Sequence, residues 1–158
     1  MTIKKYLISA CLVGENVRYD GKNCLQQQLK KLVATGQAVM ICPEVSGGLN
    51  TPRLPAEIVK GHGVDVLNGQ AKVLDTSGND VSDAFILGAT KALKLAQQHQ
   101  VTHVILKANS PSCGSKLIYD GTFSGQKIQG QGVTTALLEQ YGFKVITEDE
   151  FLAQFNEA

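Results

Sequence analysis

The chain has 158 residues, of which 43% are apolar and 18% are charged, and its formal net charge at pH 7 is +1. This length suits one domain with a buried core, so we expect residues 1–158 to fold as a single domain. The near-zero net charge argues against nucleic-acid binding, and no apolar run approaches the roughly 18 residues of a membrane span. The first apolar run is too short for a signal-peptide core and is interrupted by Ser9, which predicts a cytoplasmic protein.

The first third of the chain predicts two buried strands with a helix between them. Short apolar runs indicate strands at 4–10 and 38–42. Between them, residues 24–35 carry the apolar stripe of a helix, which Gly36 ends. The following stretch, 43–62, is rich in Gly and Pro, and a loop of that length in a small domain is typically functional or disordered.

The rest of the chain predicts a hairpin and a further alternation of helices and strands. Residues 64–74 alternate in hydrophobicity around Asn68-Gly69, which indicates a β-hairpin beside the main sheet. We then expect helices at 83–99, 134–141 and 149–155, and strands at 102–107 and 143–147. A long glycine-rich loop is expected at 108–132.

This order of elements predicts an α/β fold, specifically a three-layer α/β/α sandwich with a mainly parallel sheet and a small β-hairpin. Right-handed crossovers lead us to expect the strand order 2-1-3-4, with the switch point between strands one and three. Open α/β sheets bind ligands at the carboxyl ends of their strands, near such a switch point.

Three of the four cysteines follow predicted strands, and this placement suggests a metal centre. Cys11, Cys42 and Cys113 each come shortly after a buried run, so their thiols are expected at one edge of the sheet. Three thiolates suit a soft metal or an iron–sulfur cluster and leave a coordination position open. The alternative is that buried cysteines act as small apolar residues, which is our interpretation of Cys24, at the start of the predicted helix.

Several polar residues near these cysteines are candidates for substrate chemistry. Arg18 and Arg53, the chain's two arginines, lie in the loops after Cys11 and Cys42, although arginines paired with surface acids would show the same pattern. Glu44 follows Cys42 by two residues and suits a general acid or base, or else a residue that caps a turn. Two serines just before Cys113 can bind a substrate or form an ordinary proline turn; they are Ser110 and Ser112.

Motifs that carry a family resemblance extend from Ser9 to Gly142. They are Ser9–Gly14, Arg18–Gly21, Cys42–Glu44, Gly47–Leu49, Thr51–Arg53, Lys107–Gly114, Tyr119–Gly121 and Gly130-x-Gly132. Taken together, these motifs resemble the thiouracil desulfurases, a family long known as a bacterial domain of unknown function. Cys24 lies outside the family pattern.

The resemblance implies a [4Fe-4S] cluster held by Cys11, Cys42 and Cys113, with a fourth iron that binds substrate sulfur. It also implies Glu44 and Ser110 as catalytic residues. From the chemistry of an open iron, we expect Glu44 to activate the water that attacks the thiocarbonyl carbon. The expected substrate is a small thiolated pyrimidine base or related thiocarbonyl compound, converted as 2-thiouracil is to uracil. Iron–sulfur assembly machinery is an expected partner. The residues expected to bind substrate are Arg18, Arg53, Asp20, Ser112 and Asp120.

Three other functions fit the same cysteines. A zinc-dependent hydrolase can use a three-cysteine site with an open position. A thiol redox protein would use two of the cysteines and form a reversible disulfide. A non-catalytic cluster sensor would bind the cluster without turnover.

Overall fold

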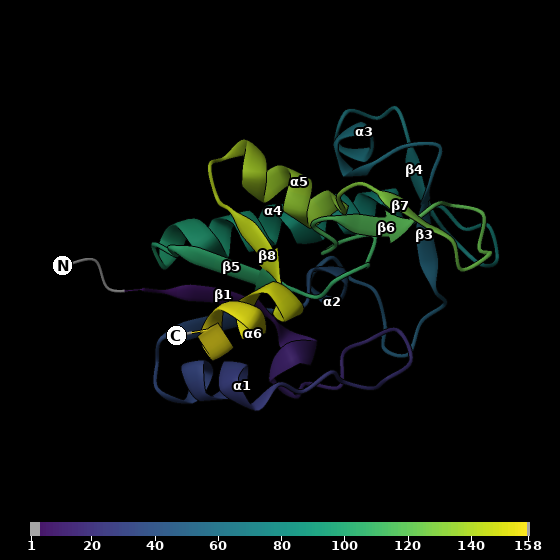
Figure 1. The fold of residues 1–158 in the computed structure, drawn as a ribbon. Helices are drawn as coiled ribbons and strands as arrows, with labels where there is room; N and C mark the ends of the chain where they lie inside the picture. The colour runs from purple at the N-terminus through teal and green to yellow at the C-terminus, as the bar shows by residue number, and fades with distance from the viewer. Residues whose placement is uncertain (1–3, 158) are drawn as a thin grey trace.

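A four-stranded parallel sheet forms the centre of the molecule (Figure 1). The computed structural model describes residues 4–157. The sheet has the order β2-β1-β5-β8, and each neighbouring pair is parallel. Its strands, in chain order, are β1 (Tyr6–Ser9), β2 (Ala38–Ile41), β5 (His103–Leu106) and β8 (Val145–Thr147). The predicted order 2-1-3-4 is therefore confirmed.

Two pairs of helices cover the two faces of the sheet and give the predicted three layers (Figure 1). One face carries α1 (Gln27–Ala34) and α6 (Glu148–Glu157), and the other carries α4 (Ser82–Gln98) and α5 (Val133–Gln140). Successive residues of a strand point to opposite faces. Accordingly, Leu7 belongs to one apolar cluster with Leu93 and Leu138, whereas its neighbour Ile8 belongs to another with Leu29. No helix within the described range is both long and apolar enough to cross a membrane.

The hairpin predicted at 64–74 is wrong in its position. The antiparallel pair consists instead of β3 (Ala56–Val59) and β4 (Lys72–Asp75), with the short helix α3 (Gly63–Leu67) between them. The carboxylate of Asp65 accepts the backbone N–H of His62 at 2.8 Å, which stabilises the start of this helix. Asn68 and Gly69 then end α3 instead of forming a hairpin turn, because a left-handed glycine also terminates helices.

A second antiparallel pair lies in the stretch predicted as the loop 108–132. It consists of β6 (Leu117–Tyr119) and β7 (Lys127–Gln129). Both two-stranded pairs share an apolar cluster with α4 and α5, in which Ile58, Ile118 and Phe85 are buried. This third cluster fixes the two small pairs at one end of the main sheet.

Short helical turns follow two of the central strands. The 3-10 helix η1 (Ala10–Val13) follows β1 directly, and α2 (Pro43–Ser46) begins two residues after Ile41, the last residue of β2. Proline suits the first turn of a helix, since its missing N–H would have no partner there. These turns position the first two cysteines of the sheet edge.

Two glycines allow α2 to lie directly against α4. A Cβ atom on Gly88 would lie 1.8 Å from the carbonyl oxygen of Pro43. A Cβ atom on Gly47 would lie 1.9 Å from the carbonyl oxygen of Ala84. The backbones therefore approach more closely than any other residue would permit, and this contact fixes α2, which carries Glu44.

We expect Gly88→Ala to destabilise the protein even though alanine favours helices. In an unconstrained helix this change would stabilise by about 1 kcal/mol. Here the new methyl group meets the backbone of Pro43, and overpacking of this kind costs about 1–3 kcal/mol. Urea unfolding measures the effect, and an unchanged or raised midpoint would contradict the close packing of α2 on α4.

Candidate active site

A cavity of about 300 Å³ lies at the carboxyl ends of β1, β2 and β5. Three cysteines line it: Cys11 in η1, Cys42 directly after β2, and Cys113 in the loop after β5. Its volume is at the lower end of the range for small-ligand sites, about 300–1,000 Å³. The structure thus brings these three cysteines to the edge where the strand order predicted them.

The three thiols lie in an environment that disfavours their free anions. Burial, with smaller contributions from the neighbouring Cys24 and Cys42 thiols, raises the pKa of the Cys11 thiol to about 12. Burial also raises the pKa of Cys42 and of Cys113, and the Cys42 and Cys11 thiols add to the effect at Cys113. A thiolate here therefore needs a cation beside it, and a bound metal deprotonates its thiol ligands. This donor set fits an iron–sulfur cluster.

The cysteines do not surround a single point. Among the side chains of residues 4–154, no three His, Cys, Asp or Glu residues form a group placed to hold one ion. In a cubane cluster each thiolate binds a different iron atom, so its cysteine ligands do not have to converge on one position.

Ser9 links Cys113 to the backbone at the end of the neighbouring strand β5. Its hydroxyl donates to the sulfur of Cys113 at 3.6 Å and accepts the backbone N–H of Lys107 at 2.9 Å. Ser9 is the polar residue in an otherwise apolar strand. This break in the apolar pattern was the signal in the sequence that could have identified Ser9 as a site residue. Its hydrogen bonds hold Cys113 at a defined position on the cavity wall.

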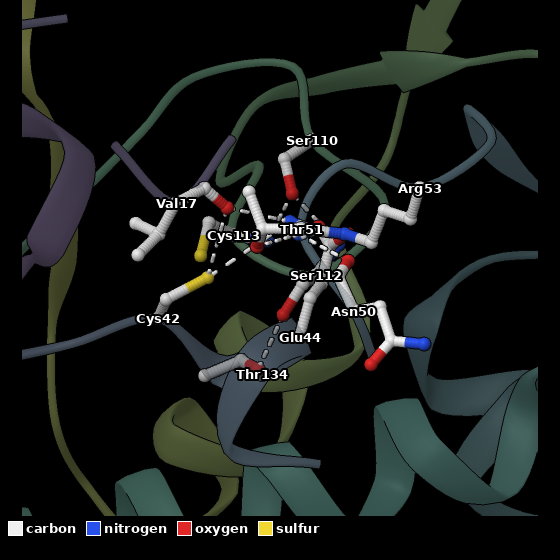
Figure 2. A network of polar contacts seen from close by, with 10 residues as sticks. All are labelled: Val17, Cys42, Glu44, Asn50, Thr51, Arg53, Ser110, Ser112, Cys113 and Thr134. Carbon is white, nitrogen blue, oxygen red and sulfur yellow. Dashed lines mark hydrogen bonds and ion pairs between the residues drawn. The ribbon is translucent and has the colours of Figure 1, made fainter. Parts of the chain in front are cut away.

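Arg53 connects Glu44 to the surrounding loops (Figure 2). Its Nε contacts Glu44 Oε1 at 3.0 Å, and its two Nη atoms donate to the carbonyl oxygens of Val17 and Asn50 at 2.9 and 3.2 Å. Nη2 also approaches the sulfur of Cys42 at 4.0 Å. The Glu44 side chain is 17% exposed and lines the cavity, so it is held in place with limited access to water.

Cys24 lies beside the site, because it contacts Arg18. Arg18 lines the cavity, and its Nη1 donates to the sulfur of Cys24 at 3.1 Å. The backbone N–H of Cys24 donates to the carbonyl oxygen of Cys11 at 2.8 Å. The expectation that Cys24 starts a helix is wrong, because α1 begins at Gln27 and Cys24 lies in the preceding loop. Cys24 does not line the cavity.

The two serines before Cys113 have different positions. Ser110 lines the cavity, and its hydroxyl oxygen accepts the backbone N–H groups of Ser112 and Cys113 at 2.9 and 3.0 Å. The hydroxyl proton of Ser110 therefore remains available for donation. Ser112 is fully buried, shares a hydrogen bond with Thr134 at 2.7 Å, and does not line the cavity.

The two aspartates expected to bind substrate lie outside the cavity. Asp20 accepts the N–H of Lys22 at 3.0 Å, and Asp120 accepts the N–H of Thr122 at 2.9 Å. Both carboxylates stabilise exposed turns, because an aspartate in a turn commonly accepts a hydrogen bond from the backbone N–H two residues further along the chain. Hydrogen bonds from Thr122 lower the pKa of Asp120. Neither aspartate, nor Ser112, is among the residues that the structure brings together at the cavity.

Sequence reasoning assigned no role to two charged residues that line the cavity. Lys107 Nζ forms an ion pair with Glu148 Oε2 at 2.9 Å. Burial alone would lower the pKa of Lys107, but the hydrogen bond to Glu148 and its negative charge outweigh burial, so the pKa is raised. Glu57 lies on β3 and is 9% exposed. Lys107 belongs to a motif of the sequence, whereas Glu57 lies in a stretch that showed no strand pattern.

Comparisons with known proteins agree on one family. The family model described as 2-thiouracil desulfurase matches residues 6–150. The uncharacterised protein YbbK of Bacillus subtilis strain 168 is 54% identical over 144 residues, which are 91% of this chain and 95% of that protein. A solved structure described as the [4Fe-4S]-dependent thiouracil desulfidase TudS is 41% identical, with a TM-score of 0.83, and the match covers 98% of this chain and 99% of that one.

Proposed function

The chain belongs to the 2-thiouracil desulfurase family, and on this basis we propose that it removes sulfur from a thiolated pyrimidine base. The reaction replaces the thiocarbonyl sulfur by an oxygen from water, as in the conversion of 2-thiouracil to uracil, and releases hydrogen sulfide. No electron is gained or lost overall. The observation that carries this proposal is the convergence of three strand-end cysteines on one cavity in a chain of this family.

We propose that Cys11, Cys42 and Cys113 hold a [4Fe-4S] cluster. Cys11 and Cys113 are buried and Cys42 is half-buried, and three thiolate ligands would leave one of the four irons without a protein ligand. When bound, the cluster supplies a thiophilic Lewis acid that binds substrate sulfur and makes the thiocarbonyl carbon more electrophilic. The match to a [4Fe-4S]-dependent desulfidase supports this cofactor.

We propose that Glu44 moves the protons. Arg53 holds Oε1 of Glu44, and no described residue donates to Oε2, which is therefore the oxygen suited to accept a proton from the attacking water. The same carboxyl group then returns that proton to the leaving sulfur or to a ring nitrogen. Arg53 holds the carboxylate in one orientation during both steps.

Ser110 is proposed to orient the substrate or the attacking water. Two backbone N–H groups occupy its oxygen, so the hydroxyl acts as a donor toward the cavity. Arg18 and Arg53 line the same cavity and are proposed to bind the substrate. We leave Asp20, Ser112 and Asp120 out of the proposed site, because their side chains are engaged elsewhere.

The cellular setting is also a proposal. A chain with unpaired cysteines and a cluster site is suited to the cytoplasm, where iron–sulfur assembly machinery would load it. We propose that residues 1–158 act as one domain, because the cavity is lined by segments from both halves of the chain.

Anaerobic cluster reconstitution, followed by a sulfide-release assay, tests the function. We expect about four irons and four acid-labile sulfides per chain, and formation of uracil and sulfide in equal amounts from 2-thiouracil. Cys24→Ser is the matched control and should retain both cluster and turnover, since Cys24 does not line the cavity. Bound zinc with hydrolase activity, a reversible disulfide without iron, or a full cluster without sulfide release would contradict the proposal and indicate the hydrolase, the redox protein or the sensor.

A further inference from the structure

Glu57 is a buried carboxylate that neither the cluster nor the proposed proton transfer uses. It lies on β3, where Pro55 and Ala56 also line the cavity, and it is 9% exposed. Burying a carboxylate is costly unless its oxygens are paired. The hydrogen-bond partners of its two carboxylate oxygens therefore have to be accounted for.

One oxygen of Glu57 is occupied by the protein. Oε1 accepts the backbone N–H of Gly121 at 2.9 Å and that of Phe123 at 3.2 Å. Both belong to the loop that joins β6 and β7. Glu57 thus fixes this loop beside the cavity.

The other oxygen of Glu57 is available to a ligand. No side chain of residues 4–154 and no backbone N–H of the described chain donates to Oε2. Within the same range, Ser115 Oγ is the one fully buried side-chain oxygen or nitrogen without a partner, so Oε2 retains accessible surface. Because Glu57 is otherwise buried and lines the cavity, that surface faces the cavity.

The charges around the cavity leave Glu57 without a cation. Arg53 pairs with Glu44, and Lys107 pairs with Glu148. No salt bridge to Glu57 occurs among the side chains of residues 4–154. A carboxylate oxygen in this position is an acceptor for an N–H donor brought by the ligand.

We propose that Glu57 determines substrate specificity by accepting a hydrogen bond from a ring N–H of the thiolated base. This inference rests on the proposed function, because it names how the same cavity recognises its substrate. In 2-thiouracil, two ring N–H groups flank the thiocarbonyl carbon. When the sulfur points toward the cysteines, one of these N–H groups can donate a hydrogen bond to a residue on the adjacent side of the cavity. A hydrogen bond to an ionised acceptor is stronger than a neutral one and favours a base with a free ring N–H over one substituted at that nitrogen.

Glu57→Gln separates recognition from loop structure. The glutamine oxygen still accepts the N–H groups of Gly121 and Phe123, whereas its NH₂ group replaces Oε2 with a donor. We expect Kd and KM for 2-thiouracil to rise by about 10- to 100-fold, with kcat and cluster content nearly unchanged. Glu139→Gln is the matched control, because Glu139 accepts hydrogen bonds from Gln131 and Val145 away from the cavity.

Substituted bases give the decisive comparison. Calorimetric binding of 2-thiouracil, 1-methyl-2-thiouracil and 3-methyl-2-thiouracil to the reconstituted protein should show at least about tenfold weaker binding of one methylated base, and Glu57→Gln should remove this difference. Equal binding of all three bases, or a variant with unchanged Kd and unchanged discrimination, would overturn the inference. A collapse of kcat at unchanged KM would instead place Glu57 in proton transfer and would also overturn it.

The binding measurement also separates this inference from the proposed function. If the reconstituted protein released no sulfide but still bound the base through Glu57, the proposed desulfuration would fail while the specificity role stood. If sulfide were released normally and Glu57→Gln changed neither binding nor selectivity, the opposite would hold.

Discussion

Cys113→Ala is expected to remove the cluster and the activity together. Cys113 is 6% exposed, lines the cavity and receives the Ser9 hydrogen bond at its sulfur, so no other thiol occupies its place on the cavity wall. Thiolates are the ligands that hold iron–sulfur clusters, and the two remaining cysteines would hold a cubane poorly. Iron and acid-labile sulfide per chain, measured after anaerobic reconstitution beside sulfide release, should both fall to background.

Cys24→Ala provides the control for thiol removal. It deletes a sulfur that contacts Arg18 but does not line the cavity, and we expect cluster content near that of the parent protein. Far-UV circular dichroism of both variants checks that the fold persists. A Cys113→Ala protein with a full cluster and normal turnover would show that Cys113 is not a ligand.

Glu44→Gln is expected to lower turnover by about 10²–10⁴, the usual contribution of a positioned general acid or base. The cluster should remain, because a carboxylate is not among its proposed ligands. The glutamine oxygen can still accept the hydrogen bond from Arg53 Nε, so the loop geometry is preserved while the proton-accepting group is lost. The measurement is iron and labile sulfide per chain, together with kcat for sulfide release from 2-thiouracil.

Normal turnover of Glu44→Gln with a full cluster would assign Glu44 a structural role as the partner of Arg53. The proton carrier would then have to be another group. Asp20 and Asp120, the two aspartates that the sequence suggested for the site, stabilise turns outside the cavity. Glu57 is the other carboxylate that lines the cavity, and its own variant would decide the matter.

The sequence predicted the sheet and its cysteines well, because both depend on strong local signals and general rules of chain topology. Buried strands appear as apolar runs, and right-handed crossovers restrict their order. Once β1, β2 and β5 are neighbours, the positions of Cys11, Cys42 and Cys113 at their carboxyl ends follow directly.

The remaining part of the site depends on contacts that no local pattern reveals. The Asn68-Gly69 pair fits a hairpin turn and a helix end equally well. It ends a helix here because the strand at Lys72–Asp75 pairs with Ala56–Val59, which lies before the helix in the chain. The position of Glu57 in the cavity wall follows from that same pairing and from the loop at Gly121. Similarly, the Asp20 and Asp120 motifs contained suitable carboxylates, but their turns satisfy them locally.

The pairing of Tyr6 with both Ala38 and His103 has a consequence for how the protein matures. The proposed ligands are separated by long stretches of chain, and they come together only after β1, β2 and β5 have paired. The unfolded chain therefore offers no cluster site, and cluster binding stabilises only the folded state by mass action. A cell short of iron would consequently hold this protein in a less stable form, more exposed to proteolysis, before any of its catalytic function is considered.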